Sequence, residues 1–357
     1  MTSMKQNDAG KPSGIRQIAD ALGISIGTVD RALHNRSGVS AKTRDKVLKM
    51  AGKLSYTPNV AARNLKLNRR LRLGVYLPAQ IASYYDTLRE GIRYAAESEA
   101  TLHIDVDFHN YPSLGEGDLE VMKKTNWLQY DGVILAPGHP NQLTDISRAA
   151  TKHNRAIVCV TTDAARMSRL AAVTADSFVS GAMAAELLGG WIADDGDVAV
   201  FTGDLEVQDH ADKLRGFAAT LALQAPQLRL APAVECHDSF QLAYEAARKM
   251  LKSHRQLRGI YVNTSNSIPV LQALSESGRM KSIRTITTDL FPELLPYLQR
   301  GDVSASLYQR PRTQGKIAVE VLCAFLSLGE VPKVNTHLTP HIILRSNLSL
   351  FMEALGT

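Results

Sequence analysis

The chain has 357 residues, enough for a small domain joined to one large or two medium-sized ones. Its hydrophobic fraction of 45% is ordinary for a globular protein, and no apolar run approaches the roughly 18 residues that would span a membrane. The net charge of +6 is unevenly spread: residues 1–70 hold fourteen Lys and Arg, four Asp and no Glu, which places +10 there and −4 in the remainder. This asymmetry argues against an evenly solvated surface and is typical of a polyanion-binding module joined to another domain.

The cysteines and the first residues suggest where the protein acts. Cys159, Cys236 and Cys323 are scattered and lack the spacing of a metal site, so we expect reduced thiols, no metal and no other cofactor. Residues 1–12 are polar and lack the apolar stretch of a secretory signal, so we expect a disordered leader. The chain is therefore expected to stay in the cytoplasm.

Two short amphipathic helices are predicted at the start of the basic segment. Apolar residues recur at helical spacing at positions 15, 18, 19 and 22, and again at 26, 29, 32 and 33, with Gly23 between the two runs. Ser25 stands where the N-cap of the second helix is expected. Two such helices about a turn of roughly three or four residues form a helix-turn-helix, although a plain helical hairpin shows the same pattern.

A third helix with basic faces is predicted next, followed by Tyr56-Thr57-Pro58-Asn59 and a short basic helix. This order, without gaps over about fifty residues, resembles the LacI/GalR family of bacterial transcription regulators. The resemblance implies a helix-turn-helix domain over residues 13–57 and a hinge helix and linker over residues 58–70. The matching residues are Ile18-Ala19, Gly23-Ile24-Ser25, Thr28-Val29, Arg31, Val39-Ser40, Thr43-Arg44, Val47, Leu54, Tyr56, Pro58-Asn59, Ala62 and Leu65.

The resemblance also implies a set of DNA contacts. The second helix would lie in the major groove, where each base pair shows its own pattern of donors and acceptors. The hinge helix is too short to be stable alone and would fold when two copies meet over the minor groove, with Leu65 as a wedge between base pairs. Gly27 lacks a side chain and Asp30 departs from the family, so the operator cannot be transferred from relatives. The candidate DNA-binding residues are Ser25, Ile26, Gly27, Thr28, Arg31, Ser40, Thr43, Arg44, Asn59, Ala62 and Leu65.

From residue 71 onward, short apolar runs alternate with longer helical stretches. This pattern predicts an α/β body of parallel sheets covered on both faces, and its size favours two lobes with a cleft between them. The family resemblance implies the same, because the LacI/GalR body resembles a periplasmic sugar-binding protein. The predicted strands are residues 73–77, 103–108, 132–136, 156–160, 197–201, 230–234, 259–262, 284–288 and 304–308.

Ligands of open α/β sheets bind beyond the carboxyl ends of the strands, and polar or aromatic side chains follow several runs there. The family has an arginine at the position of Lys213, and a lysine loses its bidentate fork. Three of these residues have alternative roles. His139 could equally be a surface residue, and Asp163, which follows the strand at 156–160, could cap a turn instead of lying at the cleft. Asp289 could bind ligand hydroxyls or serve as an N-cap for the segment after Pro292. The polar and aromatic residues after these strands favour a neutral polyhydroxylated ligand, such as a monosaccharide or polyol. A purine would require more aromatic side chains for stacking. The candidate ligand-binding residues are Tyr84, Tyr85, His139, Lys213, Asn263, Asp289 and Gln309.

These patterns together predict a ligand-gated DNA-binding regulator, expected to be a repressor. A homodimer on a pseudo-palindromic operator is expected, because two recognition helices would then meet two half-sites. No hydrolase, zinc-protease or nucleotide-binding motif appears, so we expect no enzyme. The alternatives are a solute-binding or sensor protein without a DNA role, which the basic segment disfavours, and a hydrolase that uses the acidic and histidine residues of 202–210.

Overall fold

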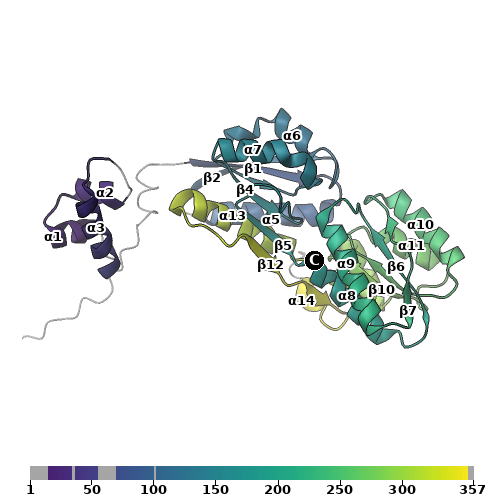
Figure 1. Ribbon diagram of the computed structural model, residues 1–357. Coiled ribbons are helices and arrows are strands. Elements are labelled where there is room, and N and C mark those ends of the chain that lie inside the picture. The colour runs from purple at the N-terminus through teal and green to yellow at the C-terminus, as the bar shows by residue number, and fades with distance from the viewer. Residues whose placement is uncertain (1–14, 34–36, 55–69, 100–101, 353–357) are drawn as a thin grey trace, which may run out of the picture. The chain divides into compact units, whose positions relative to one another are not determined.

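The computed structural model describes residues 15–33, 37–54, 70–99 and 102–352 (Figure 1). The chain divides into two compact units, residues 1–69 and 70–357, which we call the head and the body. No helix in the described ranges is long and apolar enough to span a membrane.

The head contains three helices around a small core of its own. They are α1 (Ile15–Leu22), α2 (Ile26–Leu33) and α3 (Ala41–Lys53). The predicted N-cap is confirmed, because the Thr28 N–H donates to Ser25 Oγ at 3.1 Å. Ile26 departs from the predicted apolar stripe, since 47% of its surface is exposed. The buried core residues are Ile18, Ala19, Val29, Ala32, Val47 and Ala51.

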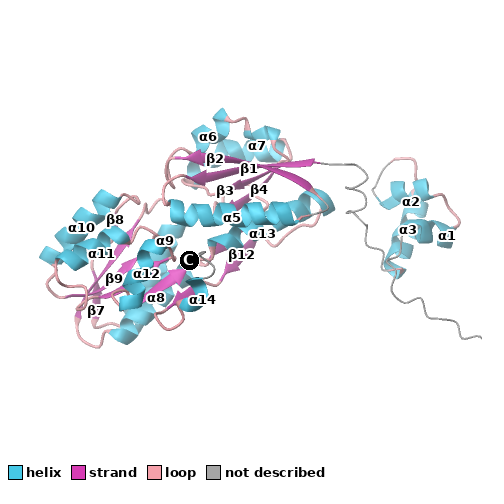
Figure 2. Cartoon of the chain, turned by 180° about the vertical axis from the view of Figure 1, so that it is seen from behind, coloured by secondary structure: helices cyan, strands magenta, loops and turns pink. Residues whose placement is uncertain are grey.

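The first lobe of the body is built on a six-stranded parallel sheet of order β12-β5-β4-β3-β1-β2. Its buried strands carry apolar residues on both faces, so each face is covered by helices, as Figure 2 shows. α5 (Ala82–Ser98) and α13 (Pro311–Leu328) pack on one face, and α6 (Asp118–Lys124) and α7 (Thr144–Lys152) on the other. The strands are β1 (Arg70–Pro78), β2 (His103–Tyr111), β3 (Gly132–Leu135), β4 (Ala156–Val160), β5 (Ala171–Ala175) and β12 (Asn335–Leu338).

The second lobe has a seven-stranded sheet of order β13-β11-β10-β9-β6-β7, with β8 also paired to β6. α8 (Ser177–Trp191) and α9 (Gln208–Gln224) cover one face. The other face carries α10 (Phe240–Ser253), α11 (Ile268–Glu276) and α12 (Leu295–Arg300). The strands are β6 (Gly196–Thr202), β7 (Leu228–Leu230), β8 (Val234–Glu235), β9 (Leu257–Val262), β10 (Arg284–Thr288), β11 (Ala305–Tyr308) and the antiparallel β13 (His341–Ile343).

Short helical segments complete the described chain. They are the 3₁₀ turns η1 (Trp127–Gln129), η2 (Pro140–Leu143) and η3 (Pro292–Leu294), and the C-terminal α14 (Ser349–Met352).

The chain passes between the lobes three times: from β5 to α8, from β11 to α13, and from β12 to β13. At the first crossing Asp176 caps α8, because its carboxylate accepts the Val179 N–H at 3.0 Å. This arrangement confirms the predicted two-lobed α/β body.

One predicted strand is wrong and three are additional. Residues 230–234 are not a strand: β7 ends at Leu230 and β8 begins at Val234. Pro232 lies between them and has no N–H for a ladder, so the chain pairs with β6 in two separate pieces. β5, β12 and β13 were not predicted, because β5 is rich in alanine and the other two are short and partly polar.

Candidate functional site

A cavity lies between the lobes, where the carboxyl ends of strands from both sheets meet, as expected for open α/β sheets. Its volume is about 30 Å³, far below the roughly 300 Å³ or more of typical ligand pockets. The lobes must therefore part to admit a ligand. The cavity is lined by Ile81, Tyr84, Tyr85, Leu114, Thr161, Asp209, His210, Lys213, Asp238, Thr264, Ser265 and Gln309.

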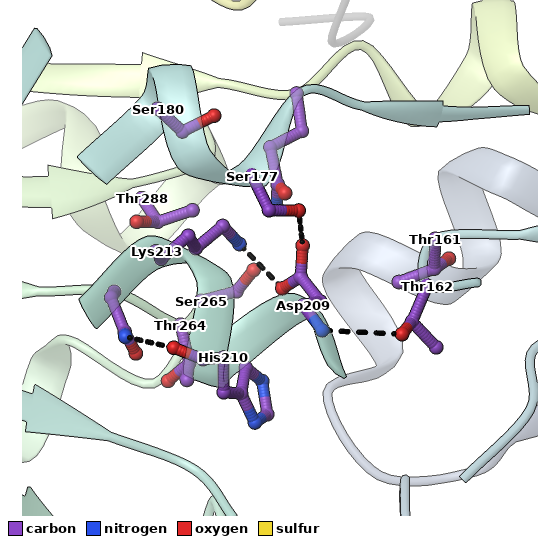
Figure 3. Close-up of polar contacts among 12 residues, drawn as sticks. Thr161, Thr162, Ser177, Ser180, Asp209, His210, Lys213, Thr264, Ser265 and Thr288 are labelled. Atoms are coloured by element: carbon purple, nitrogen blue, oxygen red, sulfur yellow. Dashed lines mark hydrogen bonds and ion pairs between the residues drawn. The ribbon is translucent and has the colours of Figure 1, made fainter. Parts of the chain in front are cut away.

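A buried ion pair on α9 lines this cavity, and Figure 3 shows the contact between its two side chains. Lys213 Nζ lies 2.7 Å from Asp209 Oδ2, and the two side chains are 1% and 3% exposed. The other carboxylate oxygen of Asp209 accepts the Ser177 hydroxyl at 2.6 Å, which ties α9 to the start of α8. The structure thus places Lys213 in the cavity as predicted from its position, but with its charge already matched by Asp209.

Asp289 follows β10 and fixes the end of β11. Its carboxylate accepts hydrogen bonds from the Ser265 hydroxyl at 2.6 Å and from the Gln309 backbone N–H and side-chain amide at 3.0 and 2.7 Å. Burial raises the pKa of Asp289, while the bonds from Ser265 and Gln309 and the charge of Lys213 oppose that rise. Asp289 does not cap the segment after Pro292, because Phe291 holds the N-cap position there.

Tyr84 and Tyr85 on α5 form the aromatic wall contributed by the first lobe. Their rings meet edge to face, with centroids 5.0 Å apart and planes inclined by 82°. The Tyr84 hydroxyl lies 3.4 Å from Thr161 Oγ1 at the end of β4. Burial raises the pKa of both phenols well above the usual value, so both remain protonated donors.

His139, Asn263 and Asp289 lie beside the cavity rather than on its lining. His139 Nε2 is 3.2 Å from Asp204 Oδ2 and 3.6 Å from Glu206 Oε2, both in the second lobe. Asn263 is fully buried and donates to the backbone oxygen of His210 at 3.3 Å. His139 thus joins the two lobes outside the cavity, and Asn263 stabilises α9 through its bond to the His210 backbone.

Further hydrogen bonds join residues of the two lobes around the cavity. Gln80 donates to the Asp238 carbonyl at 2.8 Å, and the Asp209 N–H donates to Thr162 Oγ1 at 3.3 Å. At a crossing, Gln314 accepts the Thr161 N–H at 3.0 Å and donates to the Gln309 carbonyl at 2.9 Å. The two lobes are therefore closed on each other in this structure.

The backbone around the cavity is strained in a way common at binding sites. Non-glycine residues rarely adopt a positive φ, yet several do so where strands or loops reach the cavity. Such residues are Ile81, Thr161, His237, Asp238, Asp289 and Arg310. The packing of both lobes holds these positions, which fixes the direction of the side chains that border the cavity.

Asp209, His210 and Asp238 are the charged or titratable lining residues that were not among the candidates. The spacing of Asp209 and Lys213, four residues apart on one helix, was a usable signal for their pairing. Asp238 lies in the loop before α10, where no pattern marked it. Asp163 pairs with Arg169 and does not line this cavity. Within the described ranges, no group of three or more His, Cys, Asp or Glu is placed to hold a metal ion.

In the head, most of the candidate DNA-binding residues lie at the starts of two helices. Ser25 caps α2 and Ser40 caps α3, where Thr43 N–H donates to it at 3.2 Å. Ile26, Gly27 and Arg31 are exposed, whereas Thr28, Thr43 and Arg44 are half-buried. Arg31 Nε lies back on its own helix, 3.2 Å from the Gly27 carbonyl. Asn59, Ala62 and Leu65 lie outside the described residues.

Comparison with known proteins matches both parts of the chain. Residues 14–59 match the lacI family of bacterial regulatory proteins, and residues 73–330 match a periplasmic binding protein domain. The chain belongs to the lacI family of regulators. It is thus a DNA-binding transcriptional regulator with a periplasmic-binding-protein-like body.

The curated relatives are regulators of the same family. The catabolite control protein A of Priestia megaterium is 25% identical over 74% of this chain and 78% of its own length. The catabolite control protein A of Staphylococcus aureus is 23% identical over 92% of this chain and 97% of its own length.

Solved structures share the fold of the body. A solute-binding protein from Burkholderia graminis, in complex with D-arabinose, has a TM-score of 0.73 at 18% identity, covering 78% of this chain and 96% of its own. GanP, a glucose-galactose binding protein from Geobacillus stearothermophilus, has a TM-score of 0.72 at 24% identity, covering 78% and 99%.

Proposed function

We propose that this regulator acts as a homodimeric repressor on a pseudo-palindromic operator and is gated by a small polyhydroxylated ligand, a monosaccharide or polyol. The observation that carries the proposal is the interlobe cavity with its buried hydrogen-bonding groups, in a chain that begins with a helix-turn-helix. A ligand hydroxyl can donate a hydrogen bond to the carboxylates of Asp289 and Asp209 and accept one from Lys213, and it can do either with the Gln309 amide. A dimer is proposed because two copies of a helix-turn-helix would meet two half-sites about one helical turn apart on such an operator.

The shape of the aromatic wall supports a sugar or polyol over a purine. Tyr84 and Tyr85 meet edge to face, so they present no pair of parallel rings between which a flat base could stack. D-Arabinose is the ligand of one structural neighbour, and we extend that ligand class to this chain. The known relatives are regulators and binding proteins, which supports a role without catalysis. A repressor acts on chromosomal DNA, and we therefore assign it to the cytoplasm.

β1 offers a physical route for gating. It begins at Arg70, the last residue of the predicted hinge helix and linker, and it leads to Ile81 at the cavity. Opening or closing the lobes around a ligand therefore acts on the strand that continues from the linker. The ligand shifts DNA binding only by its different affinity for the two lobe arrangements.

The proposal is tested by electrophoretic band shift with the full-length protein and the DNA upstream of its own gene. We expect a discrete complex that competitor DNA of unrelated sequence does not displace, and an affinity that falls steeply with salt. Adding sugars and polyols one at a time should change the affinity for at least one of them. Equal binding to all sequences at every salt concentration would refute specific recognition.

The predicted hinge wedge is tested by Leu65→Ala, with Leu67→Ala in the predicted linker as control. Leu65→Ala should keep the melting temperature and ligand-induced shift of the parent, but lose operator affinity and DNA bending. Unchanged bending in a circular-permutation assay would remove Leu65 from that role.

A further inference from the structure

The residues around the cavity carry more negative than positive charge. Asp209 and Asp238 line the cavity, and Asp289 is buried beside them, bonded to Gln309. Among the described residues that line it, Lys213 is the only lysine or arginine, and its ammonium is paired with Asp209. Within the described part of the chain, Asp238 and Asp289 form no ion pair.

Asp238 is held at the cavity by its backbone. His237 and Asp238 have φ values of 47° and 52°, and Gln80 of the other lobe holds the Asp238 carbonyl at 2.8 Å. The Asp238 Oδ1 atom is buried, with no hydrogen-bond partner among the described residues. A carboxylate oxygen taken from water without a partner is unfavourable, so this atom points to a donor that a ligand would bring.

Two side-chain amides also lack a partner for their oxygen atoms: Gln309 lines the cavity, and Gln80 contacts it through the Asp238 backbone. The side-chain nitrogen of Gln309 donates to Asp289 and that of Gln80 to the Asp238 carbonyl, which identifies the other atom of each amide as oxygen. Both Oε1 atoms are buried without a partner in the described chain, and Gln309 is only 5% exposed. A ligand rich in donors fits all three orphan oxygens, whereas a carboxylate or phosphate fits none of them.

We propose that the cleft selects a positively charged polyhydroxylated compound, an amino sugar or amino polyol whose ammonium group pairs with Asp238. The proposal rests on the proposed function: it keeps the polyhydroxylated ligand and adds one ammonium group to it. A neutral sugar satisfies the amide oxygens but leaves the Asp238 charge unmatched when the lobes close. A uronic acid or sugar phosphate adds a like charge, which is repelled.

The test uses full-length protein and sets of three probes that share one ring: a hexose, its 2-amino derivative and its uronic acid, in the gluco, galacto and manno series. Dissociation constants are measured by calorimetry at neutral pH. In at least one series the amino sugar should bind about tenfold or more tighter than the hexose, since a hydrogen bond to a charged group contributes roughly 1.5–3 kcal/mol, of which 1.4 kcal/mol corresponds to a factor of ten. The uronic acid should bind more weakly than the hexose.

Asp238→Asn isolates the charge. Asparagine tolerates the left-handed backbone as well as aspartate does, so this variant keeps the loop conformation. Its preference for the amino sugar over the hexose should fall to about twofold or less, because the remaining hydrogen bonds are uncharged. The control, Asp195→Asn, removes an exposed carboxylate in the loop before β6 and should keep the full preference.

The outcomes separate this inference from the proposed function. If a hexose binds at least as tightly as its amino derivative in every series, or if Asp238→Asn keeps the preference, the charge selection is wrong while the sugar cleft stands. If a uronic acid binds best, the charge selection is also wrong. If no probe binds, the ligand class of the proposed function fails, and this inference fails with it.

Discussion

The two lobes have similar sheets but contribute different chemistry to the cavity between them. The first lobe presents Ile81, Tyr84, Tyr85, Leu114 and Thr161, a surface of aromatic, aliphatic and hydroxyl groups. The second lobe presents Asp209, His210, Lys213, Asp238, Thr264, Ser265 and Gln309, of which four are charged or titratable and the rest are polar. The difference indicates that the second lobe orients a ligand through charges and hydrogen bonds, while the first covers it with apolar surface.

The largest effect is expected from breaking the buried ion pair of the second lobe. Lys213→Met leaves the buried Asp209 carboxylate unpaired and should lower the free energy of unfolding by about 3–5 kcal/mol. The double variant Lys213→Met with Asp209→Asn should recover most of that loss, since no buried charge remains. The measurement is urea unfolding followed by circular dichroism.

Lys249→Met, at an exposed position on α10, is the matched control and should change stability by less than about 0.5 kcal/mol. A double variant as unstable as the single one would show that the charge of Asp209 is not the cause.

Asp289→Asn should weaken binding of the sugar found in the ligand screen by about ten- to a hundredfold, because the charged acceptor that holds the lining residues Ser265 and Gln309 is lost. The pH dependence has a definite sign. Burial raises the pKa of Asp289, and its ionised form accepts the hydrogen bonds that hold Ser265 and Gln309 at the cavity, so affinity should fall as pH drops through that raised pKa. Calorimetry of the parent and of Asp289→Asn across acidic pH checks this: an equal acid-side loss in both proteins would assign the titration to another group.

The sequence predicted this site where polar residues directly follow buried strands. Asp289 and Gln309 come after runs of apolar and β-branched residues, so the rule for parallel sheets placed them at the same edge. Lys213 lies on a helix, and only the family resemblance identified it. The two lobes followed from the alternation of strand and helix patterns, although β12 and β13 are too short and polar to be distinguished from loops.

The sequence could not predict how the lobes meet. The His139–Asp204 contact joins residues 65 positions apart, and the left-handed backbone that presents Asp238 is bonded to Gln80 from the other lobe. Such contacts arise from packing of the complete body rather than from local periodicity. The placement of Asp238 and of His139 therefore required the structure.

A smaller effect is expected from the first lobe. Tyr84→Phe removes a hydroxyl whose bond to Thr161 is long, at 3.4 Å, while keeping the ring, so stability should fall by at most about 1 kcal/mol. If the first lobe acts mainly through apolar surface, ligand affinity should also fall less than in Asp289→Asn. Thermal unfolding and calorimetry measure the two quantities. A loss of affinity equal to that of Asp289→Asn would assign an orienting role to the first lobe as well.

The smallest effect is expected from His139, at the edge of the interface between the lobes. Its side chain is 18% exposed, and its partners Asp204 and Glu206 are 20% and 78% exposed, so solvent screens the contact. His139→Ala should therefore change the free energy of unfolding by less than about 1 kcal/mol. Because the contact joins the lobes only when they are closed, its loss should instead favour opening, seen as faster ligand dissociation at nearly unchanged stability. Gln142→Ala, which removes the amide 3.0 Å from His139 Nδ1 but no interlobe contact, is the control. Dissociation rates that are equal in both variants would show that the contact does not hold the lobes together.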